Sequence, residues 1–170
     1  WLCRDIKNRF MDKMRDELLK NADSILRELT SGEYQKMIPG DNLLNPDFTF
    51  TLADGSTQDG ADILSRGTKE QVFLAVRLGR ILDIKPALPV IIDDSFVNYD
   101  PLHLKQAVHI ISRLSSTHQI FLMTCHPYLI NLIAETGAAC QYWQLENGQF
   151  TESDRDSLAR HLEVNSLPHQ

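Results

Sequence analysis

One apolar run that ends at two adjacent carboxylates constrains the fold of this chain more than any other feature. Residues 90–92 read Val-Ile-Ile, and Asp93 and Asp94 follow directly. The run has no alternation with polar residues, which predicts a central parallel strand covered by helices on both faces. Ligands on open α/β sheets bind beyond the carboxyl ends of the strands. The two aspartates are therefore predicted to lie at a site, and a carboxylate pair there indicates a divalent cation.

The size of the chain favours a single domain with a sizeable core. It has 170 residues, of which 42% are apolar and 24% are charged, the usual balance of a globular protein. No apolar run approaches the roughly 20 residues that cross a bilayer, and the charged start lacks the apolar core of a signal peptide. We therefore expect no membrane partner and a cytoplasmic location.

Charge and cysteine usage argue against two further classes of protein. The net charge of -6 excludes a generally basic nucleic-acid-binding surface, so any contact with DNA would need a local patch or another chain. Cys3, Cys125 and Cys140 are an odd number at wide spacings. This pattern predicts reduced structural thiols rather than disulfides or a zinc site.

The first thirty residues are predicted to form one long amphipathic helix. Apolar residues recur at helical spacing while charged residues fill the other face. These apolar positions are Met14, Leu18, Ala22, Ile25 and Leu29. The pattern leaves two alternatives open, an ordinary packed helix or the root of a coiled coil that enters a globular head.

The middle of the chain predicts a small β-element and then a helix. Phenylalanine and leucine alternate with threonine over residues 48–52, and Asp54-Gly55 supplies a hairpin turn. A helical pattern then runs over residues 72–82. Ser65 and Gly67 lie at the entrance to this helix.

The last seventy residues predict alternating helices and strands. Pro101 opens a helix, and an apolar strand over residues 119–124 ends just before His126. We expect this strand to lie beside the strand that ends at Asp93. A short helix over 128–134, a strand over 141–145, an Asn147-Gly148 hairpin turn, a strand over 149–151 and a helix from Glu152 follow.

Taken together, these motifs resemble the second half of an ABC-type ATPase head. The chain presents Ser65-x-Gly67, then Asp93-Asp94, then Asn98-x-Asp100, and then a strand that ends at His126. They are most similar to the group of SMC, SbcC and RecF-like ATPases, and within it to bacterial YhaN-type proteins. The resemblance implies an α/β fold, a partial head lobe with a mainly parallel sheet flanked by helices. Residues 1–30 would be the coiled-coil root, 31–151 the ATPase lobe with a small β-hairpin, and 152–170 a C-terminal helix and tail.

The resemblance implies catalytic roles for three residues. Asp93 matches the Walker B aspartate that holds Mg²⁺; by itself it could simply cap the next loop. Asp94 stands where the group usually has a glutamate that positions the attacking water, and it could instead be a second acid around Mg²⁺. His126 matches the switch histidine that reaches the γ-phosphate, although a lone histidine after a strand is commonly a structural hydrogen-bonding residue.

Four more residues match loops that act across a dimer interface. Ser65 and Gly67 correspond to the signature loop, which serves the nucleotide of the other protomer; the alternative is a plain helix cap. Asn98 and Asp100 correspond to the D-loop, and otherwise they are turn formers with the N-cap before Pro101.

No G-x-x-x-x-G-K-[ST] loop occurs in the sequence. By resemblance, the N-terminal lobe of the same polypeptide would supply this Walker A loop, and ATP and Mg²⁺ would be the cofactors. The expected function is DNA repair or chromosome maintenance by a homodimer that closes around ATP, with DNA and, by analogy, a nuclease subunit as partners. We expect the chain to be inactive alone. The alternatives are a self-contained Mg²⁺-dependent nuclease or phosphohydrolase, and a non-hydrolysing nucleotide-dependent scaffold.

Overall fold

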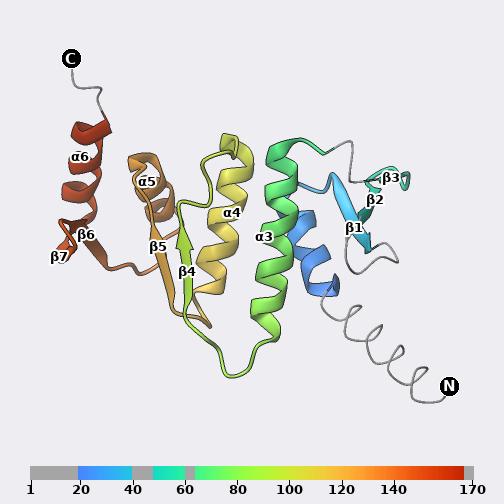
Figure 1. Cartoon of the computed structure of the whole chain (residues 1–170), viewed down its shortest axis with the longest axis horizontal. Helices are drawn as coiled ribbons and strands as arrows, with labels where there is room; N and C mark the ends of the chain where they lie inside the picture. Colours follow the sequence, from blue (N-terminus) through green and yellow to red (C-terminus); the bar gives the residue numbers. More distant parts are fainter. Residues whose placement is uncertain (1–18, 40–47, 60–63, 167–170) are drawn as a thin grey trace. The chain divides into compact units, whose positions relative to one another are not determined.

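The computed structural model describes residues 19–39, 48–59 and 64–166 (Figure 1). They fall into two compact units. The first contains the described residues up to Leu88 together with Asn98–Gln106, and the second contains Pro89–Val97 together with the chain from Ala107. The helix expected over residues 1–30 is present over residues 19–29. Its first eighteen residues, on which the coiled-coil prediction depends, lie outside the described part.

The described part of the first unit contains two helices, the start of a third and a small antiparallel sheet. Besides the helix over 19–29 it has α3 (Arg66–Asp83) and the strands β1 (Tyr34–Pro39), β2 (Phe48–Leu52) and β3 (Thr57–Asp59) in the order β1-β2-β3. The predicted hairpin is confirmed by the antiparallel pairing of β2 with β3. At its turn Gly55 has a φ of +83°, which glycine adopts without steric cost.

Apolar side chains from the helices and the sheet make up the core of this unit. The buried residues include Leu26, Leu29, Met37, Phe50, Val72, Ala75 and Leu78. The ring of Tyr34 meets that of Phe50 edge to face, with the centroids 5.6 Å apart. The backbone N–H of Met37 donates to Asp23 Oδ1 at 2.7 Å, which ties the sheet to the helix over 19–29. Burial raises the pKa of the Asp23 carboxyl above its ordinary value.

The second unit is organised around a parallel strand pair. Its elements are β4 (Val90–Asp93), most of α4 (Pro101–Leu114), β5 (Ile120–Met123), α5 (Pro127–Glu135), β6 (Tyr142–Glu146), β7 (Gln149–Ser153) and α6 (Arg155–Ser166). The pairing of β4 with β5 is parallel, and β6 with β7 is an antiparallel hairpin. Asn147 and Gly148 both have positive φ at its turn, as a tight hairpin requires. No described helix is both long and apolar enough to span a bilayer.

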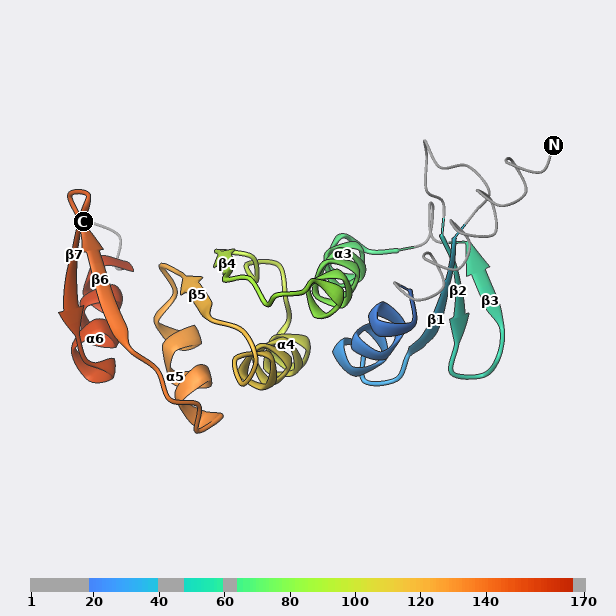
Figure 2. The same cartoon turned by 90° about the horizontal axis from the view of Figure 1, so that it is seen from below.

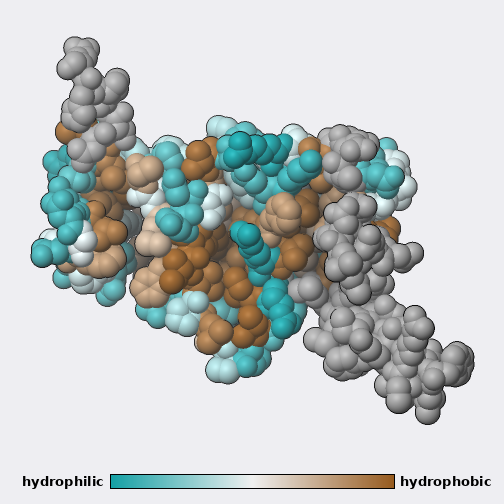
Figure 3. Space-filling view, viewed as in Figure 1, coloured by the Kyte–Doolittle hydropathy of each residue, from teal (hydrophilic) through white to brown (hydrophobic). Residues whose placement is uncertain are grey.

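Within the described residues the central strand is covered on one face only, so the expected two-sided cover is wrong for this part of the chain. Val90 and Ile92 are buried, whereas Ile91 between them is 68% exposed. Figure 2 shows α4 and α5 on the same side of the β4–β5 pair. On the other face Phe121 and Met123 are exposed beside Ile91, and Figure 3 shows hydrophobic surface over this pair. In the described residues the expected mainly parallel sheet amounts to this one parallel pair, and the other sheets are antiparallel.

Candidate functional site

The parallel pairing of β4 and β5 brings predicted site residues from two parts of the sequence to one sheet edge. Asp93 is in register with Met123, and the next N–H, that of Asp94, donates to the Met123 carbonyl at 3.0 Å. Parallel strands end at the same edge, so the segments after them meet there. His126 Nε2 lies 3.4 Å from Asp94 Oδ1. The prediction that the strand before His126 lies beside the strand of Asp93 is confirmed.

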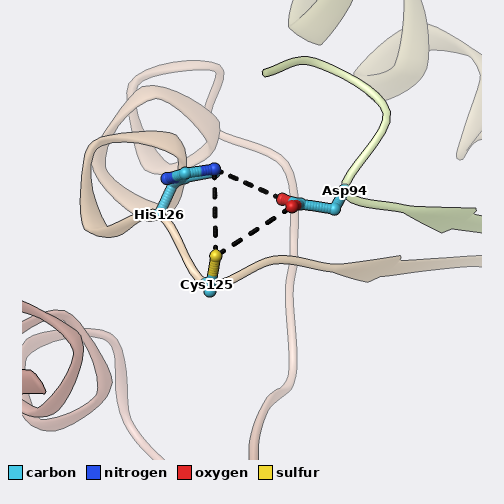
Figure 4. A group of neighbouring side chains, drawn as sticks. All are labelled: Asp94, Cys125 and His126. Atoms are coloured by element: carbon cyan, nitrogen blue, oxygen red, sulfur yellow. Dashed lines mark hydrogen bonds and ion pairs between the residues drawn. The ribbon is translucent and has the colours of Figure 1, made fainter. Parts of the chain in front are cut away.

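Cys125 is a third member of this cluster, and sequence reasoning missed it. Its Sγ lies 4.0 Å from Asp94 Oδ2 and 3.8 Å from His126 Nε2. In Figure 4 the three side chains point toward one another, and their ligand atoms all lie within 4.8 Å. The wide sequence spacing of the cysteines argued against a shared site. The signal that could have revealed it is local, since Cys125 directly precedes His126 after an apolar strand.

The backbone at both strand ends holds these side chains in place. Asp94 has a φ of +42°, a left-handed conformation that is uncommon for a residue with a Cβ and costs about 1–3 kcal/mol. Its N–H bond to Met123 and the burial of Phe96 just after it support this conformation. Just after β5 the N–H of His126 donates to Thr124 Oγ1 at 3.0 Å. The imidazole stacks on Tyr128, with centroids 5.2 Å apart and planes 24° apart.

Asp93 lies next to this cluster but outside it. As the last residue of β4 it alternates with the buried Ile92 and is exposed. Its carbonyl oxygen accepts a hydrogen bond from Ser95 Oγ at 3.1 Å, which shapes the turn after the strand. The Asp93 carboxylate is therefore open to solvent at the edge where Asp94 and His126 meet.

The predicted signature and D-loop residues lie in the first unit and are described separately. Ser65 is the N-cap of α3, because its Oγ accepts the Thr68 N–H at 3.1 Å. Gly67 lies beside the backbone of Asn98, whose carbonyl oxygen would be 3.4 Å from a Cβ at position 67. Asn98 Nδ2 in turn donates to Glu70 Oε1 at 2.7 Å. The structure therefore brings Gly67 and Asn98 together at the entrance to α3.

Asp100 caps the start of α4. Its Oδ1 accepts the N–H groups of Leu102 and His103 at 3.0 and 3.2 Å, and its Oδ2 makes a short contact with His103 Nδ1. The hydrogen bond from the His103 side chain is the main reason that the pKa of the Asp100 carboxyl lies below its ordinary value. The capping role that the sequence left open for Asp100 is thus present.

Comparison with solved structures identifies this fold. The chain superposes with a TM-score of 0.70 and 18% identity on a structure from work on ATP-driven dimerization and DNA-stimulated activation of SMC ATPases, covering 96% of this chain and 99% of that one. The Smc head domain of Pyrococcus yayanosii gives 0.69 and 17%, over 96% of this chain and 32% of that one. A SmcHead bound to the C-winged helix domain of ScpA gives 0.62 and 19%, over 88% and 45%. The chain has the fold of part of an SMC ATPase head.

One protein is also similar to this chain in amino-acid sequence. The chain is 33% identical over 115 residues to the uncharacterized protein YhaN of Bacillus subtilis (strain 168), which is 66% of this chain and 12% of YhaN. The chain thus spans about an eighth of the length of this curated relative. No protein-family model matches the chain. The predicted resemblance to SMC-type heads is confirmed, and the similarity to YhaN supports the narrower resemblance to YhaN-type proteins.

Proposed function

We propose that this chain is the C-terminal lobe of an SMC-like ATPase head in DNA repair or chromosome maintenance. In this proposal the head dimerises around ATP and Mg²⁺, and the N-terminal part of the same polypeptide supplies the Walker A loop. One observation carries the proposal. The parallel β4–β5 pair sets Asp94 and His126 3.4 Å apart beyond the strand ends, where α/β sheets bind their ligands.

The carboxylates at this edge suit a magnesium ion. Asp93 and Asp94 are adjacent and exposed, and carboxylate oxygens are the ligands of a hard cation that keeps most of its waters. Asp93 would hold Mg²⁺, and the bound ion would neutralise charge on the phosphates. Asp94 would orient the attacking water and accept its proton. Because aspartate is one methylene shorter than glutamate, we expect slow hydrolysis.

His126 is placed to contact the terminal phosphate of a nucleotide at the same edge. Its side chain is 31% exposed, and its Nε2 points to Asp94. Stacking on Tyr128 limits rotation of the ring, so a contact made by Nε2 would be reported to the end of β5. His126 would hydrogen-bond the γ-phosphate in this proposal.

In this proposal each nucleotide site is formed by two protomers, and the entrance to α3 supplies the part that faces the partner's nucleotide. Ser65 is exposed there, and the first turn of this 18-residue helix carries no acidic residue, so the positive end of the helix dipole is uncompensated. Gly67 has no side chain beside the Ser65 hydroxyl, from which a Cβ would be 3.9 Å away, and this would leave room for the partner's γ-phosphate. Asn98 and Asp100, which we assign to the D-loop by resemblance, would cross the dimer interface.

The exposed apolar face of the β4–β5 pair is evidence that another lobe packs on it. A two-stranded sheet is marginal by itself, and Ile91, Phe121 and Met123 leave an apolar face exposed. We assign the Walker A lobe to this face. DNA and, by analogy, a nuclease subunit remain partners in the proposal, with DNA contacted by a local patch or by another chain.

ATP hydrolysis by two samples tests this function. The 170-residue chain alone should not turn over ATP, whereas the chain joined to its Walker A lobe should show Mg²⁺-dependent turnover. An Asp156→Asn control, which alters an exposed acid on α6, should leave turnover unchanged. Robust turnover by the chain alone would instead favour a self-contained phosphohydrolase. ATP-driven dimerisation without single-turnover hydrolysis would favour the scaffold.

A further inference from the structure

The cluster of Asp94, Cys125 and His126 has a chemistry that the hydrolysis site does not explain. A thiol has no role in holding Mg²⁺ or in orienting water, yet Cys125 is exposed and directed at the same carboxylate as His126. Thiolate and imidazole are the preferred ligands of zinc and of related transition metals. The cluster thus offers one sulfur, one nitrogen and one carboxylate donor to a softer ion.

The distances in the cluster are close to those of a zinc site, and one of the three falls within its range. With Zn–N and Zn–O bonds of about 2.0 Å and a Zn–S bond of about 2.3 Å, tetrahedral angles separate the ligand atoms by about 3.3–3.6 Å. The observed separations are 3.4 Å for His126 Nε2 to Asp94 Oδ1, 3.8 Å for Cys125 Sγ to His126 Nε2 and 4.0 Å for Cys125 Sγ to Asp94 Oδ2. With one ligand atom from each residue the three atoms lie within 4.8 Å of one another, so the exposed thiol and carboxylate would turn toward the imidazole to close around one ion.

The backbone of Asp94 and the backbone and ring of His126 are held before any metal arrives. Asp94 is held by its N–H bond to Met123, and His126 by its N–H bond to Thr124 and its stacking on Tyr128. Pre-organised ligands lose little conformational entropy on binding. The three protein ligands leave a fourth position open to water, as in zinc sites that remain accessible.

We propose that Asp94, Cys125 and His126 form a Zn²⁺ site and that zinc bound there inhibits ATP hydrolysis. The inhibitory half rests on the proposed function, because zinc would occupy the carboxylate that orients water and the imidazole that contacts the γ-phosphate. The binding half rests on the geometry alone. Mg²⁺ at Asp93 and Zn²⁺ at the cluster would thus lie at the same sheet edge, and zinc would inhibit by occupying Asp94 and His126.

Cobalt titration of the 170-residue chain tests the binding half. One equivalent of Co²⁺ should give an intense near-ultraviolet sulfur-to-cobalt band that Zn²⁺ abolishes. Cys125→Ser should lose this band. Its zinc affinity should also fall by more than the roughly 10–100-fold that is lost when a residue that only hydrogen-bonds a metal ligand is changed. Cys140→Ser, which changes another exposed cysteine, should behave as the wild type. A band that survives Cys125→Ser or disappears in Cys140→Ser overturns the site.

A measurement on the unsubstituted chain guards against a variant that fails to fold. Zinc should protect Cys125 from alkylation, as read by mass spectrometry, and leave the labelling of Cys140 unchanged. Equal labelling of Cys125 with and without zinc overturns the proposal.

Zinc inhibition of ATP hydrolysis by the complete head tests the inhibitory half of the proposal. Micromolar Zn²⁺ should slow turnover at least tenfold in the wild type and in Cys140→Ser, and a zinc-selective chelator should restore it. In Cys125→Ser the inhibition, measured against that variant's own zinc-free rate, should be lost. Equal inhibition in Cys125→Ser overturns the inhibitory half. A zinc-free head that does not hydrolyse ATP contradicts the proposed function instead, while the cobalt result still decides the site.

Discussion

Gly79 of α3 lies against Ala22 of the helix over 19–29, so closely that a Cβ at position 79 would be 2.8 Å from the Ala22 backbone nitrogen. The neighbour is helix backbone, which cannot yield as a flexible side chain would. The two helices of the first unit therefore approach each other at a point where only glycine fits.

Gly79→Ala should destabilise the first unit, although alanine is the better helix former. In an open helix this change would gain about 0.5–1 kcal/mol, whereas overpacking costs about 1–3 kcal/mol. We expect a net loss of about 1–2 kcal/mol of unfolding free energy, measured by urea denaturation. Arg80→Ala, at the next and exposed position, should stay within about 0.5 kcal/mol of the wild type. A more stable Gly79→Ala variant would contradict the close approach.

Acid should weaken the start of α4 through Asp100. The pKa of this carboxyl is lowered in the folded state by its hydrogen bond with the His103 side chain. A group with a depressed folded pKa stabilises the fold above its unfolded pKa and loses that contribution as the pH falls through the folded value. We expect Asp100→Asn to flatten the acid limb of a plot of melting temperature against pH, below the ordinary aspartate pKa. An acid limb identical to that of the wild type would exclude this contribution.

Asp94→Asn, in a head that includes the Walker A lobe, should block hydrolysis and leave ATP binding intact. The amide keeps the size of the side chain but cannot accept a proton from the attacking water. ATP should then trap the dimer, seen as a lasting doubling of mass by light scattering. The wild-type head should return to monomer as ATP is consumed. Unchanged turnover in Asp94→Asn would assign the base to another residue.

Ser65→Arg should abolish ATP-driven pairing while each head still binds nucleotide. The long guanidinium at the exposed N-cap of α3 would block the approach of the partner's γ-phosphate, and Asp93, Asp94 and His126 would be unchanged. Loss of the cap alone is worth about 1 kcal/mol. Ser65→Ala is therefore the matched control, because it loses the cap without adding bulk and should still pair.

Mixing variants tests whether Ser65 acts across the interface. A Ser65→Arg head paired with a complete head defective in its Walker A loop places both defects in one composite site and leaves the other site intact. Partial recovery of activity is expected in that mixture. A Ser65→Arg head that dimerises and hydrolyses ATP normally by itself would contradict action in trans.

Much of the fold could be predicted because apolar periodicity marks the helices, and Asp54-Gly55 and Asn147-Gly148 mark the turns of the two hairpins. The strand β1 was missed for an identifiable reason. Its pairing with β2 has a bulge between Tyr34 and Lys36. The bulge lets Tyr34 and Met37, three residues apart, both be buried, and so breaks the period of two by which strands are recognised.

At the site, too, some features could be predicted from the sequence and others could not. Strand order was enough to predict that His126 lies near Asp94, because parallel neighbours end at one edge. The exposure of Ile91 could not be read from the sequence, since an unbroken apolar run does not say which face is covered. Cys125 was missed because the wide spacing of the cysteines argued against a shared site, and its contact with Asp94 arises only from the pairing of β4 with β5.

The parallel pair also has a consequence for handling the chain by itself. In the described residues β4 pairs only with β5, so each of the two strands has an outer edge with unpaired backbone groups beside an apolar face. Such an edge is a template onto which another copy can add a strand. Concentrated samples of the chain should therefore aggregate through these strands. Ile91→Lys, which puts a charge on the bare face, should delay the onset of turbidity.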